Sequence, residues 1–310
     1  MPKSISVSKS KTFHGCRLGF KYKYIDKYEM VTPYKDPVTT KGLVLHEAFE
    51  RLLKYENYAG DNPMSLEELK VNRKVADTKA VMEAFKAAME ENAFGIEDAK
   101  NFRLKLGLKR WLSFKHDFLD KRNSILYAEK KYDEELFPGV NTVTILDLLE
   151  DNLDGTFTIY DYKTPQRANV SNYKAQVITY AYQMACVKGI IKVGSDDYDK
   201  VAEKFKLYIF FPLMEGDHED YAPCLKPVKF TAEDVKKTIE ELKQTCTDID
   251  TCDFTKSAEV LQPAKMDNFT CRFCDYLGAA PQPEIGFEGC PISKFAGYKQ
   301  KSLFKRPDAT

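Results

Sequence analysis

The stretch from residue 125 to residue 163 constrains the fold most, because three β-rich runs follow one another there with turn signals between them. The runs cover residues 125–132, 140–149 and 156–163, and the dipeptides Pro138-Gly139 and Asp154-Gly155 separate them. Such punctuation between short apolar runs is typical of hairpins in an antiparallel sheet. The sequence therefore predicts that the middle of the chain forms a sheet.

Helical patterns flank this sheet on both sides. Apolar residues at helical spacing predict a helix over 41–55, and residues 60–122 continue mostly helical. Beyond the sheet, the pattern predicts a helix over 172–188, a buried strand over 206–213 and a helix from about 232 to 245. We therefore divide the chain into a basic N-terminal segment (1–40), a helical region (41–122), a mixed core (123–230) and a C-terminal helix with a Cys-rich tail (231–310).

Composition limits the classes of function. Among 310 residues, 47 basic side chains balance 47 acidic ones, which argues against a protein coated all over for nucleic acid. Any nucleic-acid site must then be a local patch. No apolar run approaches the length that crosses a bilayer, and no basic-then-apolar leader follows Met1, so we expect a cytoplasmic protein that does not associate with membranes.

The sharpest chemical signal lies in the second and third β-rich runs. Side chains alternate along a strand, so Asp161 and Lys163 project from one face, and Asp147 joins them if the two runs pair across the Asp154-Gly155 turn. Two carboxylates are hard oxygen ligands for Mg²⁺ or Mn²⁺, and a lysine beside them can act on a metal-bound water. The group predicts a site that hydrolyses phosphodiesters. The alternative is a solvated Asp–Lys pair, but an unpartnered Asp147 within an apolar run would be costly.

Three more residues extend this group. Gln176 and Tyr180 are four apart on one face of the helix that follows the sheet, so either could reach Asp161 or a bound phosphate. His46 lies at the edge of the apolar stripe of helix 41–55, where it could be a third metal ligand or a base. The alternatives are ordinary partly buried polar residues and a core histidine.

The order of these motifs resembles the RecB-type branch of the PD-(D/E)XK nucleases, which includes the Cas4 and AddB-like proteins. The resemblance covers Gly42-x-x-x-His46-Glu47, Asp147, Asp161-Tyr162-Lys163-Thr164 and Gln176-x-x-x-Tyr180. It implies an α/β fold of the restriction-endonuclease-like kind, in which helices flank a mixed sheet and a helical insertion separates His46 from that sheet. The segment 123–230 would be the nuclease core.

The resemblance also implies a role for each residue. The metal ligands would be His46, Asp147, Asp161 and the carbonyl of Tyr162. Lys163 would assist the attacking water, while Gln176 and Tyr180 would support the active site and the DNA.

Proteins of this branch often carry a 4Fe–4S cluster that one N-terminal and three C-terminal cysteines hold. Here these would be Cys16, Cys271, Cys274 and Cys290. Four thiolates can equally close a tetrahedral Zn²⁺ site, and a single C-x-x-C does not choose between them. The fifteen residues between Cys274 and Cys290 exceed the usual spacing, so Cys252 or Cys246 could replace Cys290.

A cluster of this kind would bring two basic segments together. The aromatic- and Lys-rich segment 9–27 would then lie beside Lys294, Lys299, Lys301, Lys305 and Arg306. Lysines attract phosphates and aromatic rings stack on unpaired bases, so the joint patch suits a single strand or a frayed DNA end. Solvated termini are the alternative.

Three functions fit these patterns. The first is a DNA exonuclease or end-processing nuclease that acts in DNA repair, phage recombination or CRISPR spacer acquisition. The second is a non-catalytic DNA-binding or assembly subunit of the same fold, and the third is a zinc-stapled protein whose Asp-x-Lys is incidental. The chain lacks the phosphate loop G-x-x-x-x-G-K followed by Ser or Thr, so a helicase or recombination partner would have to unwind the DNA.

Overall fold

The computed structural model describes residues 4–30, 37–57, 83–90, 102–261, 274, 276, 281–290 and 304–305. The chain forms two compact units. We call residues 1–34, 137–142 and 239–310 the terminal unit, and residues 35–136 and 143–238 the sheet unit. The division into four segments that the sequence suggests stays a prediction. Within the described residues, no helix is both long enough and apolar enough to cross a membrane.

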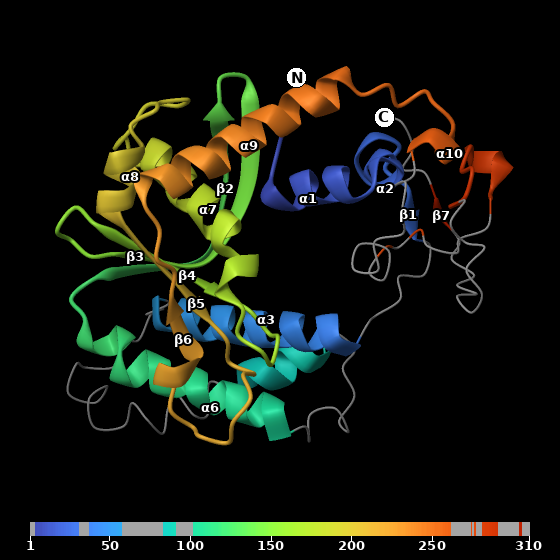
Figure 1. Cartoon of the computed structure of the whole chain (residues 1–310). Helices are drawn as coiled ribbons and strands as arrows, with labels where there is room; N and C mark the ends of the chain where they lie inside the picture. Colours follow the sequence, from blue (N-terminus) through green and yellow to red (C-terminus); the bar gives the residue numbers. More distant parts are fainter. Residues whose placement is uncertain are drawn as a thin grey trace. The chain divides into compact units, whose positions relative to one another are not determined.

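The sheet is mixed, with five strands in the order β2-β3-β4-β5-β6 (Figure 1). The strands β3 and β4 are antiparallel with Leu148 opposite Tyr160, whereas β4 and β5 are parallel with Asp161 opposite Ile209. The strand β6 is antiparallel to β5. The strand bounds are β2 (Ile125–Phe137), β3 (Val140–Asp151), β4 (Phe157–Tyr162), β5 (Phe205–Phe210) and β6 (Leu225–Pro227). The predicted mixed sheet flanked by helices is confirmed.

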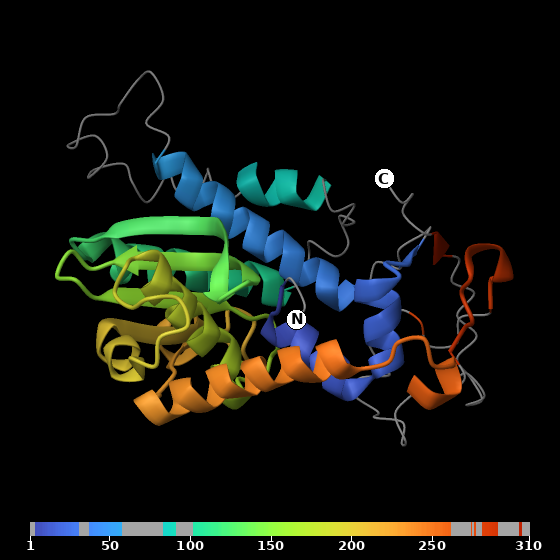
Figure 2. The ribbon, with the colours of Figure 1, turned by 90° about the horizontal axis from the view of Figure 1, so that it is seen from above.

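Helices cover both faces of this sheet, and every residue of β4 is therefore buried. On one face lie α3 (Pro37–Asn57) and α6 (Phe102–Asp117), and Figure 2 shows α3 along the green strands. The ring of Phe49 on α3 stacks on Trp111 of α6 at 4.8 Å and meets Tyr162 edge-on at 5.4 Å. Apolar residues at helical spacing thus join α3 and α6 to β4 in one core.

On the other face lies α7 (Lys174–Val187), which contacts β4 and β5 and whose buried residues include Val177 and Ala181. The chain passes from β4 through α7 and α8 (Tyr198–Lys204) to β5, and such a helical crossover allows two consecutive strands to be parallel. The helix α9 (Ala232–Thr251) begins in the sheet unit, where Asp234 pairs with Lys174 at 2.8 Å. The predicted helices 41–55, 172–188 and 232–245 correspond to α3, α7 and α9.

The predicted helical region 60–122 is described only in part. Residues 83–90 and α6 are helical, and the 3₁₀ turn η2 (Leu119–Lys121) follows. The remainder of the region before residue 102 lies outside the described residues. Two further 3₁₀ turns of the sheet unit are η3 (Val170–Asn172) and η4 (Ala222–Cys224).

The terminal unit consists of short elements around an aromatic core. Ser6 caps the first helix by accepting the Lys9 N–H at 3.2 Å. The two ends of the chain meet in a pair of antiparallel strands, with Glu29 opposite Lys305. The core residues are Leu18, Tyr22, Tyr28, Leu261, Tyr276 and Phe287. The elements are α1 (Val7–Gly15), α2 (Arg17–Phe20), the π-helix η1 (Lys21–Ile25), β1 (Glu29–Met30), α10 (Ala258–Leu261), η5 (Pro283–Ile285) and β7 (Phe304–Lys305).

Candidate active site

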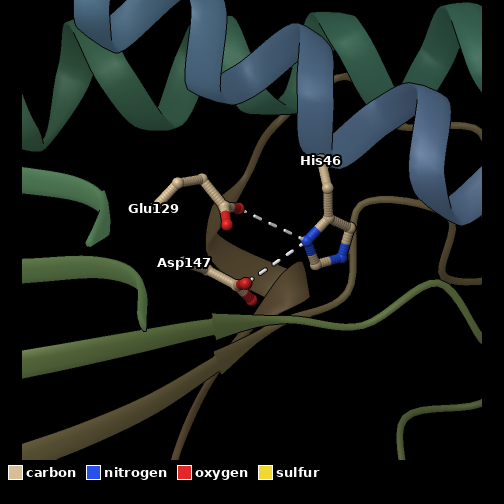
Figure 3. Close-up of side chains that lie close together, drawn as sticks. All are labelled: His46, Glu129 and Asp147. Atoms are coloured by element: carbon tan, nitrogen blue, oxygen red, sulfur yellow. Dashed lines mark ion pairs between the residues drawn. The ribbon is translucent and has the colours of Figure 1, made fainter. Parts of the chain in front are cut away.

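Three side chains from three elements of the sheet unit meet beside the sheet (Figure 3). His46 reaches down from α3, and its Nδ1 lies 3.3 Å from Asp147 Oδ1 of β3 and 3.8 Å from Glu129 Oε1 of β2. One nitrogen or oxygen atom from each residue lies within 4.8 Å of the others. Among the described residues, this is the group of His, Cys, Asp and Glu that lies close enough to share one metal ion.

Local structure explains how each of the three side chains is presented. His46 follows the fully buried Leu45 on α3, and its ring lies edge-on to Tyr162 at 5.8 Å. Asp147 lies on the face of β3 opposite to its buried neighbours Leu146 and Leu148, and its side chain is 11% exposed. Glu129 has a φ of +45°, which falls in the left-handed region that a non-glycine residue rarely adopts. Unusual backbone of this kind is often found at functional sites.

Asp161 and Lys163 lie at the same edge of the sheet. Because Leu148 pairs with Tyr160, the next pair in the antiparallel register is Asp147 with Asp161. Asp161 is 2% exposed, and the Lys163 ammonium lies 2.6 Å from its Oδ2 atom. The backbone N–H of Tyr162 donates to Asp147 Oδ2. The structure thus brings together the two carboxylates and the lysine that the strand pattern predicts.

The charges of this group perturb one another. Burial raises the pKa of Asp161 to about 6, although the Lys163 ammonium opposes the rise. Burial also raises the pKa of Glu129. Burial by itself would lower the pKa of His46, but Asp147 and Glu129 outweigh it and raise that pKa to about 10. Three carboxylates therefore face two cationic groups in a largely buried site.

A divalent cation fits this donor set. Carboxylate oxygens are the ligands that Mg²⁺ and Mn²⁺ prefer, and a neutral imidazole can complete their coordination. Binding would release the proton that the carboxylates hold on His46, because a metal takes the unprotonated ring. The carbonyl of Tyr162 as a further ligand stays a prediction.

Gln176 and Tyr180 lie together on α7, as their spacing predicts. The side-chain amide of Gln176 donates to the Tyr180 hydroxyl at 2.5 Å. Burial, and after it the charge of Asp161, raises the pKa of Tyr180, so the hydroxyl stays protonated. A neutral hydrogen-bonded pair therefore faces the Asp161 end of the site.

Glu129 is the residue of this group that the sequence did not single out. It lies within the predicted strand 125–132. The sequence did carry a signal, because Glu129 is an acidic residue within a β-rich run, as Asp147 is. The neighbouring acid Glu47, which the resemblance places beside His46, instead forms an ion pair with Arg51 four residues along α3.

Four cysteines lie near the aromatic core of the terminal unit. Cys16, Cys252 and Cys274 pack against it, and Cys290 follows Gly289, whose carbonyl accepts the Tyr22 hydroxyl at 2.7 Å. The Cys16 sulfur accepts the Gly19 N–H at 3.2 Å. Burial raises the pKa of Cys246, on α9, to about 11. Cys271 lies outside the described residues.

Comparison with known families agrees with this geometry. The model of the PD-(D/E)XK nuclease superfamily matches residues 4–279, and the chain therefore belongs to that superfamily. The mixed sheet with flanking helices is consistent with its restriction-endonuclease-like fold. Membership and the acidic group together indicate a metal-dependent nuclease. A search of curated proteins finds no significant match.

Proposed function

We propose that the protein is a Mg²⁺- or Mn²⁺-dependent deoxyribonuclease that removes nucleotides from, or processes, DNA ends. The observation that carries this proposal is the meeting of His46, Glu129 and Asp147 with Asp161 and Lys163 at one sheet edge. The activity would serve DNA repair, recombination or phage- or CRISPR-type DNA processing, together with a helicase or recombination partner.

The residues divide into those that would hold the cation and those that would act beside it. His46, Asp147 and Asp161, with the Tyr162 carbonyl and now Glu129, would hold it. When bound, the cation lowers the pKa of a coordinated water and neutralises charge on the phosphate. Lys163 would orient the attacking water, and the Gln176–Tyr180 pair would donate hydrogen bonds beside Asp161.

Two features support an unpaired strand or a frayed end as the substrate. Val143 and Ile145 are 45% and 49% exposed on the same face of β3 as Asp147, and apolar side chains at that place can contact bases. In the terminal unit, Lys9 and Lys23 lie 5.4 and 5.9 Å from the centre of the Tyr24 ring. Burial and the nearby Lys27 lower the pKa of Lys9, and a phosphate would relieve this repulsion.

The proposed basic patch extends to the C-terminal segment. The pairing of Glu29 with Lys305 supports this idea, because it joins the two chain ends. Lys294, Lys299, Lys301 and Arg306 lie outside the described residues.

We also propose that the terminal unit holds a 4Fe–4S cluster, as in the RecB-like branch, with Zn²⁺ as the alternative. Cysteines that are distant in sequence share one aromatic core, and an N–H donated to sulfur, as at Cys16, stabilises a thiolate ligand. Cys16, Cys271 and Cys274 would be ligands. Both Cys290 and Cys252 lie near this core, so either could complete the set.

The direct test is a time course on end-labelled single- and double-stranded DNA with Mg²⁺, Mn²⁺ or EDTA. We expect hydrolysis with metal and none with EDTA, and no cleavage of a closed circle if the enzyme requires an end. Asp161→Asn should be inactive. Asp151→Asn, on the same strand as Asp147 but beyond the site, is the matched control and should stay active. Hydrolysis that persists in EDTA and in Asp161→Asn would contradict the proposal.

A further inference from the structure

Tyr173 occupies the N-cap of α7, yet its side chain forms no capping hydrogen bond. Ser, Thr, Asp and Asn are preferred at this position because their side-chain oxygens accept a backbone N–H of the first turn. A tyrosine forgoes that bond. The capping of the helix therefore does not explain why a large aromatic residue lies there.

The contacts of the ring point to Lys163. The Lys163 Nζ lies 5.3 Å from the centre of the Tyr173 ring, within the range of a cation–π contact. The Tyr173 ring also lies near Phe211, the residue directly after β5, with 6.1 Å between the two ring centres. Lys163 itself is tied to the end of β5 by its backbone N–H, which donates to the Phe210 carbonyl at 2.9 Å.

The Lys163 ammonium thus has two partners of different kinds. Asp161 holds it by an ion pair at 2.6 Å, and the ring of Tyr173 holds it by an uncharged π face. Only the first partner is a candidate metal ligand. A divalent cation on Asp161 would both occupy the carboxylate and repel the ammonium, whereas the attraction to the ring would remain.

We propose that Tyr173 is a positioning residue, whose ring keeps the Lys163 ammonium beside the reacting phosphate while Asp161 holds the cation. This inference rests on the proposed nuclease function and adds to it a residue outside the predicted motif. The first turns of α7 would then contribute to the site twice, through the ring of Tyr173 and through the Gln176–Tyr180 pair.

The test compares Tyr173→Phe with Tyr173→Leu. The first keeps the ring and should retain activity, whereas the second removes the π face and keeps an apolar side chain. A misplaced catalytic group can cost about 10- to 100-fold in rate, so we expect Tyr173→Leu to lower kcat by that factor and to leave KM within about twofold. Tyr221→Leu, which removes a ring packed on Phe114 and Phe118, is the control and should keep kcat.

Two kinetic outcomes would overturn this role. If Tyr173→Phe lost as much activity as Tyr173→Leu, the hydroxyl and not the ring would be required. If Tyr173→Leu raised KM at an unchanged kcat, the residue would contact substrate instead of positioning Lys163.

A second measurement does not need activity. The melting temperatures of Tyr173→Leu, Lys163→Met and the double variant form a cycle that isolates the ring–ammonium interaction. We expect Tyr173→Leu to destabilise the protein less when Lys163 is already Met, and additive effects would overturn the proposal. A wild-type protein that hydrolyses no phosphodiester would refute the nuclease function, whereas additive melting effects would refute the Tyr173–Lys163 contact, so the two failures are distinguishable.

Discussion

The sheet unit and the terminal unit bury different kinds of residues. The sheet unit buries charged groups on its strands, such as Glu150 and Asp161, and on its long helices, such as Arg110 of α6. The terminal unit buries mainly tyrosine, phenylalanine and leucine, and its described strands and several of its helices span only two to five residues. A sheet covered by long helices can bury charged groups and satisfy their hydrogen bonds. A small unit of short elements buries less surface, so a crosslink adds more to its stability. This difference is why we place chemistry in one unit and a structural cluster in the other.

The buried charges of the sheet unit are themselves of two kinds. The Arg110 guanidinium donates to the carbonyls of Pro212, Met214, Gly216 and His218 at 2.7–3.0 Å. Glu150 accepts hydrogen bonds from Arg122, Ser124 and Tyr160. These groups are satisfied and serve the fold. At the candidate active site the carboxylates outnumber the cations, and this imbalance marks a place for a bound cation.

The largest expected effect is a loss of DNA hydrolysis when the active-site residues of the sheet unit are replaced. Asp161→Ala or Lys163→Ala should lower DNA hydrolysis by ~10³-fold or more, the scale on which loss of one member of a catalytic group acts. Both variants should remain folded and bind DNA, because they leave the proposed basic patch of the terminal unit unchanged. Cleavage of labelled DNA and a binding assay on the same samples measure this. Activity near wild type in either variant would remove the proposed site.

The next effect concerns the terminal unit. Cys16→Ser should lose iron and sulfide as fully as Cys274→Ser does, because both are proposed ligands of one cluster. Closing a loop of 100 residues or more stabilises a fold by about 4–5 kcal/mol in loop-closure estimates, so cluster loss should lower the melting temperature clearly. It should also weaken DNA binding and reduce its salt dependence.

Iron and sulfide per chain, together with thermal melting, check this second prediction. Cys186→Ser, on α7 of the sheet unit, is the control and should keep its iron. A Cys16→Ser protein with a full iron complement would show that the two chain ends share no cluster. Comparing Cys252→Ser with Cys290→Ser identifies the fourth ligand.

A smaller effect tests whether Glu129 of the sheet unit is a metal ligand. Glu129→Gln keeps the shape of the side chain and removes one of three carboxylate charges. The Mn²⁺ concentration for half-maximal activity should rise about 10- to 100-fold, the range seen when groups that tune a metal site are lost. Calorimetric titration of Mn²⁺ provides a readout that does not depend on turnover. Glu134→Gln, an exposed change on the same strand, should leave the affinity unchanged.

The smallest effect tests the substrate surface of β3. Ile145→Ser removes an exposed apolar group beside Asp147, and partial burial of such a side chain by a base is worth about 1 kcal/mol. The KM for single-stranded DNA should therefore rise roughly fivefold, with kcat unchanged. Val193→Ser, at an exposed valine elsewhere in the sheet unit, serves as the comparison. An equal KM for both variants would exclude a base contact at Ile145.

Much of the fold follows from local patterns. The β-rich runs 140–149 and 156–163 and the turn signal between them predicted β3 and β4, and the helical period predicted α3, α7 and α9. These patterns involve only residues that are close in sequence, so they can be interpreted without the tertiary structure. The same kind of local pattern placed Asp161 and Lys163 on one face and Gln176 beside Tyr180.

The sequence predicted only part of the candidate site. Asp147 was selected from its place in an apolar β-rich run, and His46 from the edge of the apolar stripe of helix 41–55. The order of the motifs then predicted the family, and the match of the superfamily over residues 4–279 confirms it. Glu129 was missed because its backbone has a positive φ, which changes the direction of its side chain. No local sequence pattern predicts that conformation for an acidic residue in a strand.

By itself, then, the sequence determined the elements, the face that each polar residue occupies and the family. Tertiary structure alone decided which of these faces meet. His46 and Asp147 lie 3.3 Å apart although about a hundred residues separate them, and Tyr173 reaches Lys163 because of where α7 begins beside β4. Such contacts arise from packing of the whole core and from the register between strands. The physical reason is that hydrophobic periodicity is local information, whereas the position of one element against another is set by burial summed over many residues.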